Sequence, residues 1–241
     1  MKNRTTLVLA LLCMAAISAQ RIKKIEGNGN VVTLTINTQE YSGISVGGPF
    51  DVALVSGKEG NITIKGEENI LEYIETEVTN GTLTIKKRNN LNIRMSRNAR
   101  VLITIPVESI NAIRLSGSGK LSSTKTLKSD HFKILASGSR YLELALEVES
   151  LSVRTSGSSN IKLMGNAKNL DVRSSGSSNF KTYELEVDNA SFVMSGSSNC
   201  EITVNESLDA KLSGSSNVKY RGNPSKLHSK ASGSARVVEM K

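Results

Sequence analysis

The chain has 241 residues, of which 38% are hydrophobic and only 4% aromatic, and its formal net charge is +9. This length is sufficient for one solenoid or two small domains. Nucleic acid is not expected as a partner despite the positive charge, because the basic run Lys86-Lys87-Arg88 is short and no known binding motif is present.

Residues 1–19 have the features of a secretory signal peptide. Lys2 and Arg4 precede the apolar run from Leu7 to Ile17, and small residues lead up to a cleavage point near Ala19. A transmembrane anchor is the alternative, but the run is shorter than the ~20 residues that a spanning helix needs. We therefore expect export to the periplasm, cell surface or exterior and no transmembrane segment. Cleavage would remove two positive charges, which leaves +9 − 2 = +7.

Residues 20–110 are predicted to form a β-rich region that is continuous with the following repeats and caps them. Alternation of apolar and polar residues indicates strands, at Val31–Ile36, Phe50–Val55, Ile62–Ile64 and Val101–Ile105. Asn80-Gly81 between two apolar segments predicts a tight hairpin. Glu67–Ile74 resembles one or two helical turns, and Pro106 is expected to end the last strand.

Residues 111–241 contain a repeated tripeptide, Ser-Gly-Ser, whose copies are 18–21 residues apart. The central glycines are Gly117, Gly138, Gly157, Gly176, Gly196, Gly214 and Gly233. Four copies extend to Ser-Gly-Ser-Ser-Asn and end at Asn160, Asn179, Asn199 and Asn217. Apolar residues keep fixed places around nearly every copy with the period of a β-strand, so the repeat is a structural unit and not a linker.

A repeat of about 19 residues is too short for a helix-pair solenoid and matches one coil of a single-stranded parallel β-helix. Equivalent residues of successive coils would then stack at ~4.8 Å. The glycines would form a ladder where the backbone turns sharply, and the asparagines a ladder of hydrogen-bonded amides. Whether that asparagine ladder faces inward or outward stays open. The predicted class is all-β.

The order of several short motifs resembles one known family. These motifs are Gly27-Asn28-Gly29, Gly48-Pro49-Phe50-Asp51-Val52, Gly66-Glu67-Glu68-Asn69, Asn80-Gly81-Thr82-Leu83-Thr84-Ile85 and Ile103-Thr104-Ile105-Pro106, followed by the Ser-Gly-Ser repeats. Together they resemble the putative auto-transporter adhesin, head GIN domain family, a domain of unknown function, from about Ile25 to Lys241. The resemblance implies a right-handed parallel β-helix in the cell envelope. It implies no catalytic residues.

Residues that could support catalysis or metal binding are few. His131 and His228 have no Cys or carboxylate at ligand spacing, and Cys200 occupies an apolar ladder position, so we expect no metal and no cofactor. Asp171 and Asp209 fall at the same position two coils apart, about 9.6 Å between backbones, which would suit an inverting glycosidase. Each acid, however, lies two residues before a base, which indicates surface ion pairs. A carbohydrate-active enzyme, a lyase or hydrolase, is therefore the alternative function.

Basic residues recur at two places in the repeat and form the predicted binding surface. Three residues before the glycines are Arg154, Arg173, Lys211 and Lys230, with Arg114, Leu135 and Val193 in other copies; five residues after them are Lys162, Lys181 and Lys219. These residues could form a basic strip that meets an anionic envelope or host polysaccharide; an ordinary solvated face is the alternative. The sequence favours a non-catalytic adhesion or scaffold protein, and does not indicate its oligomeric state.

Overall fold

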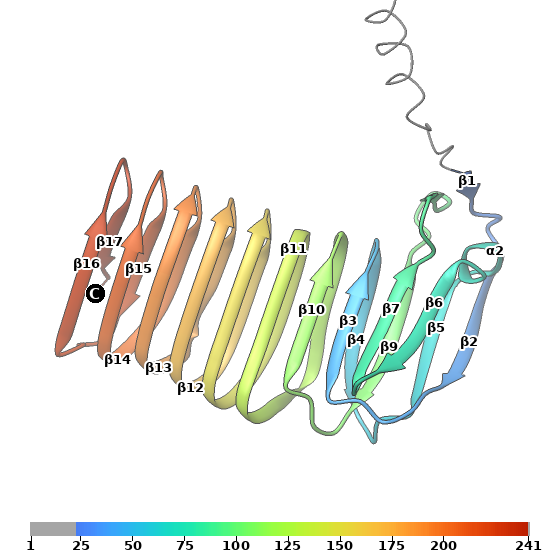
Figure 1. Cartoon of the computed structure of the whole chain (residues 1–241), viewed down its shortest axis with the longest axis horizontal. Helices are drawn as coiled ribbons and strands as arrows, with labels where there is room; N and C mark the ends of the chain where they lie inside the picture. Colours follow the sequence, from blue (N-terminus) through green and yellow to red (C-terminus); the bar gives the residue numbers. More distant parts are fainter. Residues whose placement is uncertain (1–22, 241) are drawn as a thin grey trace, which may run out of the picture.

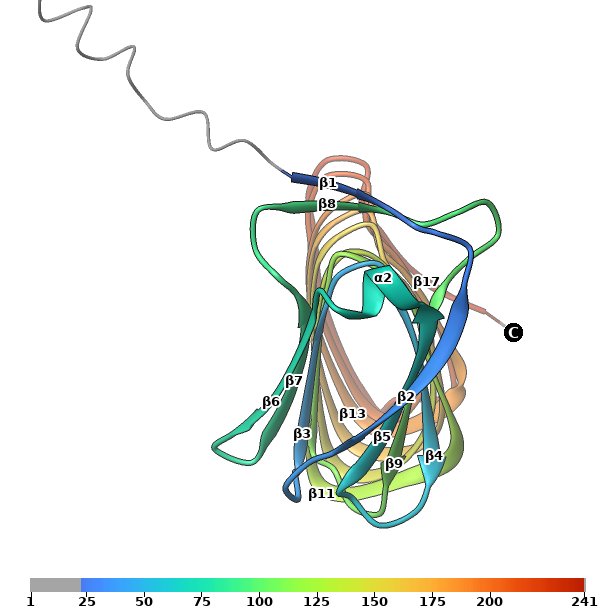
Figure 2. The same cartoon turned by 90° about the vertical axis from the view of Figure 1, so that its right-hand side faces the viewer.

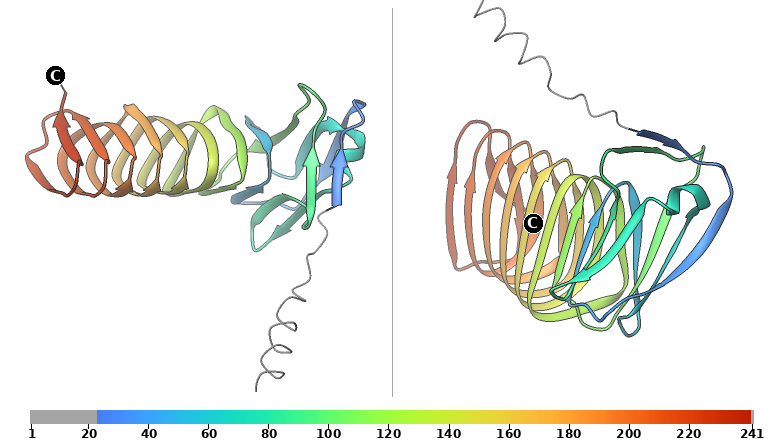
Figure 3. Two further views of the ribbon diagram at one scale, coloured as in Figure 1. Left: turned by 90° about the horizontal axis from the view of Figure 1, so that it is seen from above. Right: turned by 45° about the vertical axis from the view of Figure 1, so that its right-hand side comes forward.

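The computed structural model describes residues 23–240 and shows a long stack of β-coils (Figure 1). The signal peptide expected at 1–19 lies outside the described residues. In this described part of the chain, fifteen strands belong to one continuous hydrogen-bonded sheet system. Viewed along the stack, successive coils superimpose as a flattened oval (Figure 2), and the view from above shows them side by side (Figure 3).

The coils comprise the following strands: β3 (Gly43–Gly47), β4 (Phe50–Ser56), β9 (Val101–Val107), β10 (Ala112–Ser116), β11 (Ser118–Gly157), β12 (Asn160–Gly176), β13 (Asn179–Gly196), β14 (Asn199–Leu212), β15 (Asn217–Arg221), β16 (Lys226–Ala231) and β17 (Arg236–Glu239). The strands from β10 to β17 pair in parallel. Strands β3 and β4, which precede the first Ser-Gly-Ser copy, also pair in parallel, β3 with β10 and β4 with β11. The predicted parallel β-helix is confirmed.

The N-terminal elements lie at one end of the stack. They are β1 (Lys23–Glu26), β2 (Val31–Asn37), β5 (Asn61–Glu67), α2 (Glu68–Leu71), β6 (Ile74–Thr79), β7 (Thr82–Lys87) and β8 (Leu91–Arg94). The hairpin expected at Asn80-Gly81 joins β6 and β7, and both turn residues have positive φ. Helix α2 is a single turn whose Ile70 and Leu71 are buried in the common core.

Pro106 does not end its strand as expected, because β9 continues to Val107. Pro106 pairs with Val55 of β4 on one side. On the other side, β5 pairs only with Leu102–Thr104. The proline therefore lies where no neighbouring strand needs a backbone N–H donor, which is where a strand tolerates it.

The core consists of apolar columns that run through the stack. One column contains Ile161, Phe180, Cys200 and Val218, which pair in register and are all buried. Burial raises the pKa of the Cys200 thiol to about 12, so the thiolate that would make it reactive is not populated at neutral pH.

The glycine ladder lies at a turn where successive backbones nearly touch. Gly157, Gly176 and Gly196 are in register, with φ of +98°, +109° and +93°. A Cβ on Gly176 would lie 2.5 Å from the carbonyl oxygen of Gly157. Both the left-handed backbone and the close approach of the next coil therefore require glycine here.

The two residues that complete the Ser-Gly-Ser-Ser-Asn motif point in opposite directions. The asparagines are mostly exposed and hydrogen-bonded along the ladder: Asn179 Nδ2 donates to Asn160 Oδ1 at 3.3 Å, and Asn217 Nδ2 donates to Asn199 Oδ1 at 3.0 Å. The preceding serines are fully buried, namely Ser159, Ser178, Ser198 and Ser216. Their hydroxyls contact backbone groups of adjacent coils, as when Ser216 donates to the Gly196 carbonyl.

Arg140 replaces serine in this buried column. It is 1% exposed, and its guanidinium donates to the carbonyl oxygens of Phe50 (3.1 Å), Gly48 (2.8 Å), Val46 (3.3 Å) and Ser116. Burial lowers its pKa to about 10, while the carboxylate of Asp51 acts in the opposite direction. A buried charge needs partners of this kind, and here they join β10 and the β3–β4 turn to the repeat.

Glu67 fixes the N-terminal segment. Its carboxylate is 1% exposed and accepts hydrogen bonds from the backbone N–H of Gly29 (2.7 Å) and Ser96 (3.0 Å) and from the Ser96 hydroxyl. Burial raises the pKa of this carboxyl, but the hydrogen bonds together outweigh burial and hold the pKa below its ordinary value.

We expect Glu67→Gln to lower the free energy of unfolding by about 2 kcal/mol at neutral pH, because bonds to a charged acceptor are replaced by weaker ones. The lowered folded-state pKa makes this stabilisation complete above the unfolded value of ~4.3, and it disappears as the pH falls through the folded-state pKa. Urea unfolding of parent and variant between about pH 7 and pH 3 should show the two stabilities converging in acid. A difference that stays constant across this range would contradict the assignment.

Candidate functional site

One column of basic residues lies on the strands that precede the glycine turn. The pairs Arg114–Leu135, Arg154–Arg173, Arg173–Val193, Val193–Lys211 and Lys211–Lys230 are in register. We call Arg114, Leu135, Arg154, Arg173, Val193, Lys211 and Lys230 the first column. Its cationic members are exposed.

The lysines that follow the glycine lie in a second column, on the strands after the turn. The register runs Glu143–Lys162–Lys181–Glu201–Lys219. Lys162 forms an ion pair with Glu143 at 3.5 Å. Burial acts to raise the pKa of the Glu143 carboxyl, but Lys162, Lys120 and the Tyr141 hydroxyl together lower it. The seven basic residues selected from the sequence therefore lie in two columns separated by the turn, and only the first column lies beside a groove.

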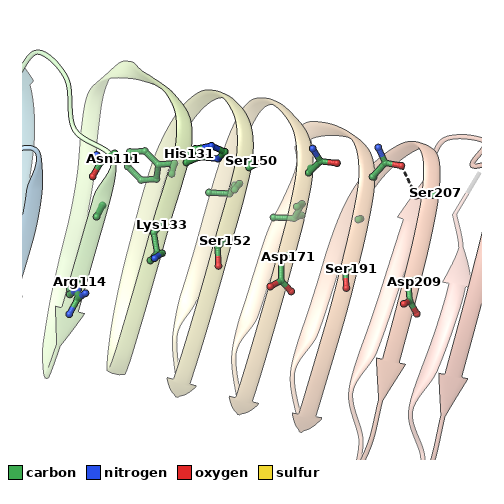
Figure 4. A pocket seen from close by; sticks show the side chains of 17 residues that line it. Asn111, Arg114, His131, Lys133, Ser150, Ser152, Asp171, Ser191, Ser207 and Asp209 are labelled. Carbon is green, nitrogen blue, oxygen red and sulfur yellow. Dashed lines mark hydrogen bonds between the residues drawn. The ribbon is translucent and has the colours of Figure 1, made fainter.

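The main groove runs across the coils beside the first column and has a volume of about 750 Å³ (Figure 4). One wall carries amide, imidazole and hydroxyl groups, from Asn111, His131, Ser150, Asn169, Asn189 and Ser207. The other carries Lys133, Ser152, Asp171, Ser191 and Asp209, with Arg114 at the end. Buried Phe132, Leu151, Leu170 and Ala190 form the floor. Six coils contribute, so the groove spans about 24 Å, five spacings of ~4.8 Å.

A smaller hollow of about 310 Å³, which we call the notch, adjoins the main groove. Arg114 lines both, so the two hollows lie next to each other at this side chain. The notch lies over Leu135, with Arg114 on one side and Arg154 on the other, and Ser116, Ser137 and Ser156 line its edge toward the glycine turn.

Charge is distributed unevenly along this face. Arg173 pairs with Asp171 at 3.5 Å and Lys211 with Asp209 at 3.7 Å. Within residues 23–240, these are the ion pairs of the face, and four other cations have no acidic partner, namely Arg114, Lys133, Arg154 and Lys230. The face formed by the main groove and the first column therefore carries six cations against two carboxylates, and three of its four unpaired cations lie at the end nearest β10.

Lys133 was not selected from the sequence, and Arg114 was noted but not chosen. Lys133 occupies a position held by Ala112, Ser152, Asp171, Ser191 and Asp209 in other coils. Because that column has no constant chemistry, repeat spacing gives no signal for it. Only the folded chain places Lys133 in the same groove as Arg114.

The predicted acidic pair occupies the same groove. Asp171 and Asp209 are both in register with Ser191, which places them two coils apart, as expected from the repeat. Each is in the ion pair expected from the sequence. His131 lies in the groove wall, whereas His228 is in β16 near the end of the stack. In residues 23–240 no three His, Cys, Asp or Glu side chains gather as a metal site.

Comparison with known proteins gives a family and a fold. The description "Putative auto-transporter adhesin, head GIN domain" matches residues 40–224, which is 185 of the 241 residues. The chain belongs to this family. The resemblance inferred from the short motifs is thereby confirmed. Comparison with curated proteins gives no match.

Solved structures share the fold of this head GIN domain. A putative adhesin from Bacteroides fragilis has a TM-score of 0.82 at 22% identity, covering 90% of this chain and all of that one. A putative lipid binding protein from Parabacteroides distasonis has a TM-score of 0.74 at 21% identity, and a putative adhesin from Parabacteroides merdae 0.72 at 20%, each covering 91% of this chain and all of its own. No helix in residues 23–240 is long and apolar enough to cross a membrane.

Proposed function

We propose that this head GIN domain protein is an exported, non-catalytic adhesin that binds an anionic polysaccharide along the main groove and the first column. The observation that carries the proposal is the continuous groove, which presents similar polar chemistry on six successive coils and unpaired cations at one end. Export is supported by the signal-like residues 1–19, and the family supports an adhesin-like role.

The form of the groove favours a polymer over a small ligand. A compact ligand would require convergent groups in a closed pocket, whereas these side chains are spread over about 24 Å at a spacing of ~4.8 Å. A polymer with regularly spaced hydroxyl groups could meet the same amide and hydroxyl row on each coil. A glycan chain provides such a repeat.

The charge favours an acidic glycan over a neutral one. Six cations against two carboxylates on one face produce a positive potential that attracts polyanions. Part of this charge is neutralised locally by the Asp171 and Asp209 ion pairs. Binding should therefore depend on the unpaired cations and weaken as salt shortens the screening length.

We expect the triple variant Arg154→Glu, Arg173→Glu, Lys211→Glu to bind polygalacturonate at least about tenfold more weakly than the parent, because a row of attractive charges becomes repulsive. Parent binding should itself fall between about 0.05 and 0.5 M salt. Isothermal titration calorimetry of the purified chain lacking residues 1–19 measures the affinity in both comparisons. Neutral dextran is the control ligand.

The second column provides the matched control variant. Lys162→Glu, Lys181→Glu, Lys219→Glu changes the net charge by the same amount on the other side of the turn, and we expect a much smaller loss. Equal losses in the two triple variants would indicate a response to net charge and would contradict binding at the groove. Melting temperatures of all variants check that folding is retained.

Polysaccharide cleavage is the alternative function, and Asp171 and Asp209 would be its acids. Both form ion pairs with bases on their own strand, at 3.5 and 3.7 Å, and among residues 23–240 no third acidic group lines the groove. The family match brings no catalytic residues with it. Prolonged incubation with polygalacturonate should release no new reducing ends; their appearance, and loss in Asp171→Asn, would favour the enzyme.

A further inference from the structure

We infer that the notch is the subsite that takes one acidic group of the bound glycan, a carboxylate or sulfate, between the guanidinium groups of Arg114 and Arg154. This inference rests on the proposed function and deepens it. It specifies where along the face a charged substituent binds and where uncharged sugar binds.

The notch exists because the first column lacks a long side chain at one coil. Arg114 is in register with Leu135, and the coil containing Arg154 follows, as the hydrogen bond from Ser158 N–H to the Gly138 carbonyl shows. The two arginines are therefore two coils apart, about 9.6 Å between backbones. Leu135 between them is shorter and only partly exposed, which leaves the hollow of about 310 Å³.

The chemistry of the notch fits one anionic group. A guanidinium presents a planar fork of donors that matches a carboxylate or sulfate, often with two hydrogen bonds. Two forks on opposite sides of a hollow can approach one group from both directions. The serine hydroxyls at the edge add further donors, and Leu135 forms an apolar base.

Other parts of the same column do not offer this arrangement. Arg173 is adjacent to Arg154 with no intervening gap, and its guanidinium already pairs with Asp171. Val193 creates a second gap, but the next cation, Lys211, pairs with Asp209. Arg114 and Arg154 are thus the pair on this face that flank a hollow without a carboxylate partner within residues 23–240.

The shared edge between notch and groove gives the bound chain a direction. Arg114 lines both hollows, so a glycan whose acidic group enters the notch can continue along the amide and hydroxyl row toward Ser207. Sugars beyond the notch and Lys133 would meet mainly hydroxyl, amide and ion-paired groups, which suit uncharged or sparsely charged residues.

The test uses short oligogalacturonates and their methyl esters, which have the same length but no charge. We expect Arg114→Gln and Arg154→Gln each to weaken oligogalacturonate binding by roughly tenfold. If both hold one group, the double variant should lose less than the product of the two single losses. Arg173→Gln, the matched control, should lose only about twofold. Leu135→Glu, which places a carboxylate in the notch, should abolish binding of the charged oligomer.

Three results would overturn the inference. If the acid binds but Arg114→Gln and Arg154→Gln behave like Arg173→Gln, the notch is not the subsite, although the proposed function stands. If neither polygalacturonate, dextran sulfate nor the oligomers bind the parent chain, the proposed function itself fails. If only phosphatidylglycerol vesicles bind, with the same dependence on both arginines, the anion belongs to a lipid surface and the glycan assignment is wrong.

Discussion

Replacement of Gly176 by valine is expected to lower the free energy of unfolding by about 3 kcal/mol, corresponding to a fall of about 10 °C in melting temperature. Two causes combine. The residue has φ of +109°, a conformation that a β-branched side chain strongly disfavours. Its Cβ would also lie 2.5 Å from the Gly157 carbonyl oxygen, so two adjacent coils must separate locally. Thermal unfolding followed by circular dichroism measures the effect.

Ser177→Val is the matched control for this experiment. It introduces the same side chain one residue later, at an exposed position without positive φ, and should change stability by less than about 0.5 kcal/mol. A Gly176→Val protein that melts with the parent would show that neither backbone strain nor coil contact limits this position.

Replacement of Arg140 by methionine is expected to cost about 3 kcal/mol or more, because the carbonyl groups that accept from its guanidinium would lose a buried donor. Methionine fills a similar volume, so the loss reports mainly on hydrogen bonding. The effect should be concentrated where these carbonyls lie, at Val46–Phe50 and Ser116. Relative to the parent, the variant should show a larger increase in amide hydrogen-exchange rate in β3 and β4 than in β13 and β14.

Arg154→Met provides the comparison for Arg140, since it removes an exposed arginine from the next coil. It should leave stability within about 0.5 kcal/mol of the parent. If Arg140→Met were equally harmless, the link between the β3–β4 turn and the repeat would not depend on this side chain.

The coils could be predicted from the sequence because one coil repeats the constraints of the next. At Gly157, Gly176 and Gly196 the backbone has positive φ and the neighbouring coil lies too close for a side chain. Each copy therefore requires glycine at this place, and the period appears directly in the sequence. Alternation around each glycine then identifies the buried columns. Strand pairing between coils follows, because equal spacing leaves a single consistent register.

Details that depend on an exception within the repeat could not be predicted in this way. The burial of Ser159, Ser178, Ser198 and Ser216 was not visible, since serine beside glycine is equally typical of an exposed turn. Arg140 occupies that buried column, yet a lone arginine in a sequence gives no sign of four carbonyl partners. Pro106 continues its strand only because β5 stops pairing at Thr104.

The candidate site could be predicted only in part, because repeat spacing identifies only the features that the coils share. Spacing identified the cations of the first and second columns but could not reveal that the glycine turn separates them. Nor could it identify the notch, which depends on the absence of a charge at Leu135. A hollow is defined by side-chain lengths on three neighbouring coils, and periodicity records only what those coils share.

The stacking of coils also determines how the length of the groove can change between related proteins. Each coil of β12 or β13 makes its contacts almost entirely with the coil before and the coil after it, so stability is a sum of local terms. Duplication or loss of one whole repeat would change only the coil interface at the junction and leave the others as they are. The length of the groove would then change in steps of ~4.8 Å. In this architecture, the length of the groove is therefore set by the number of repeats in the gene, and it can change while the other coils keep their sequence.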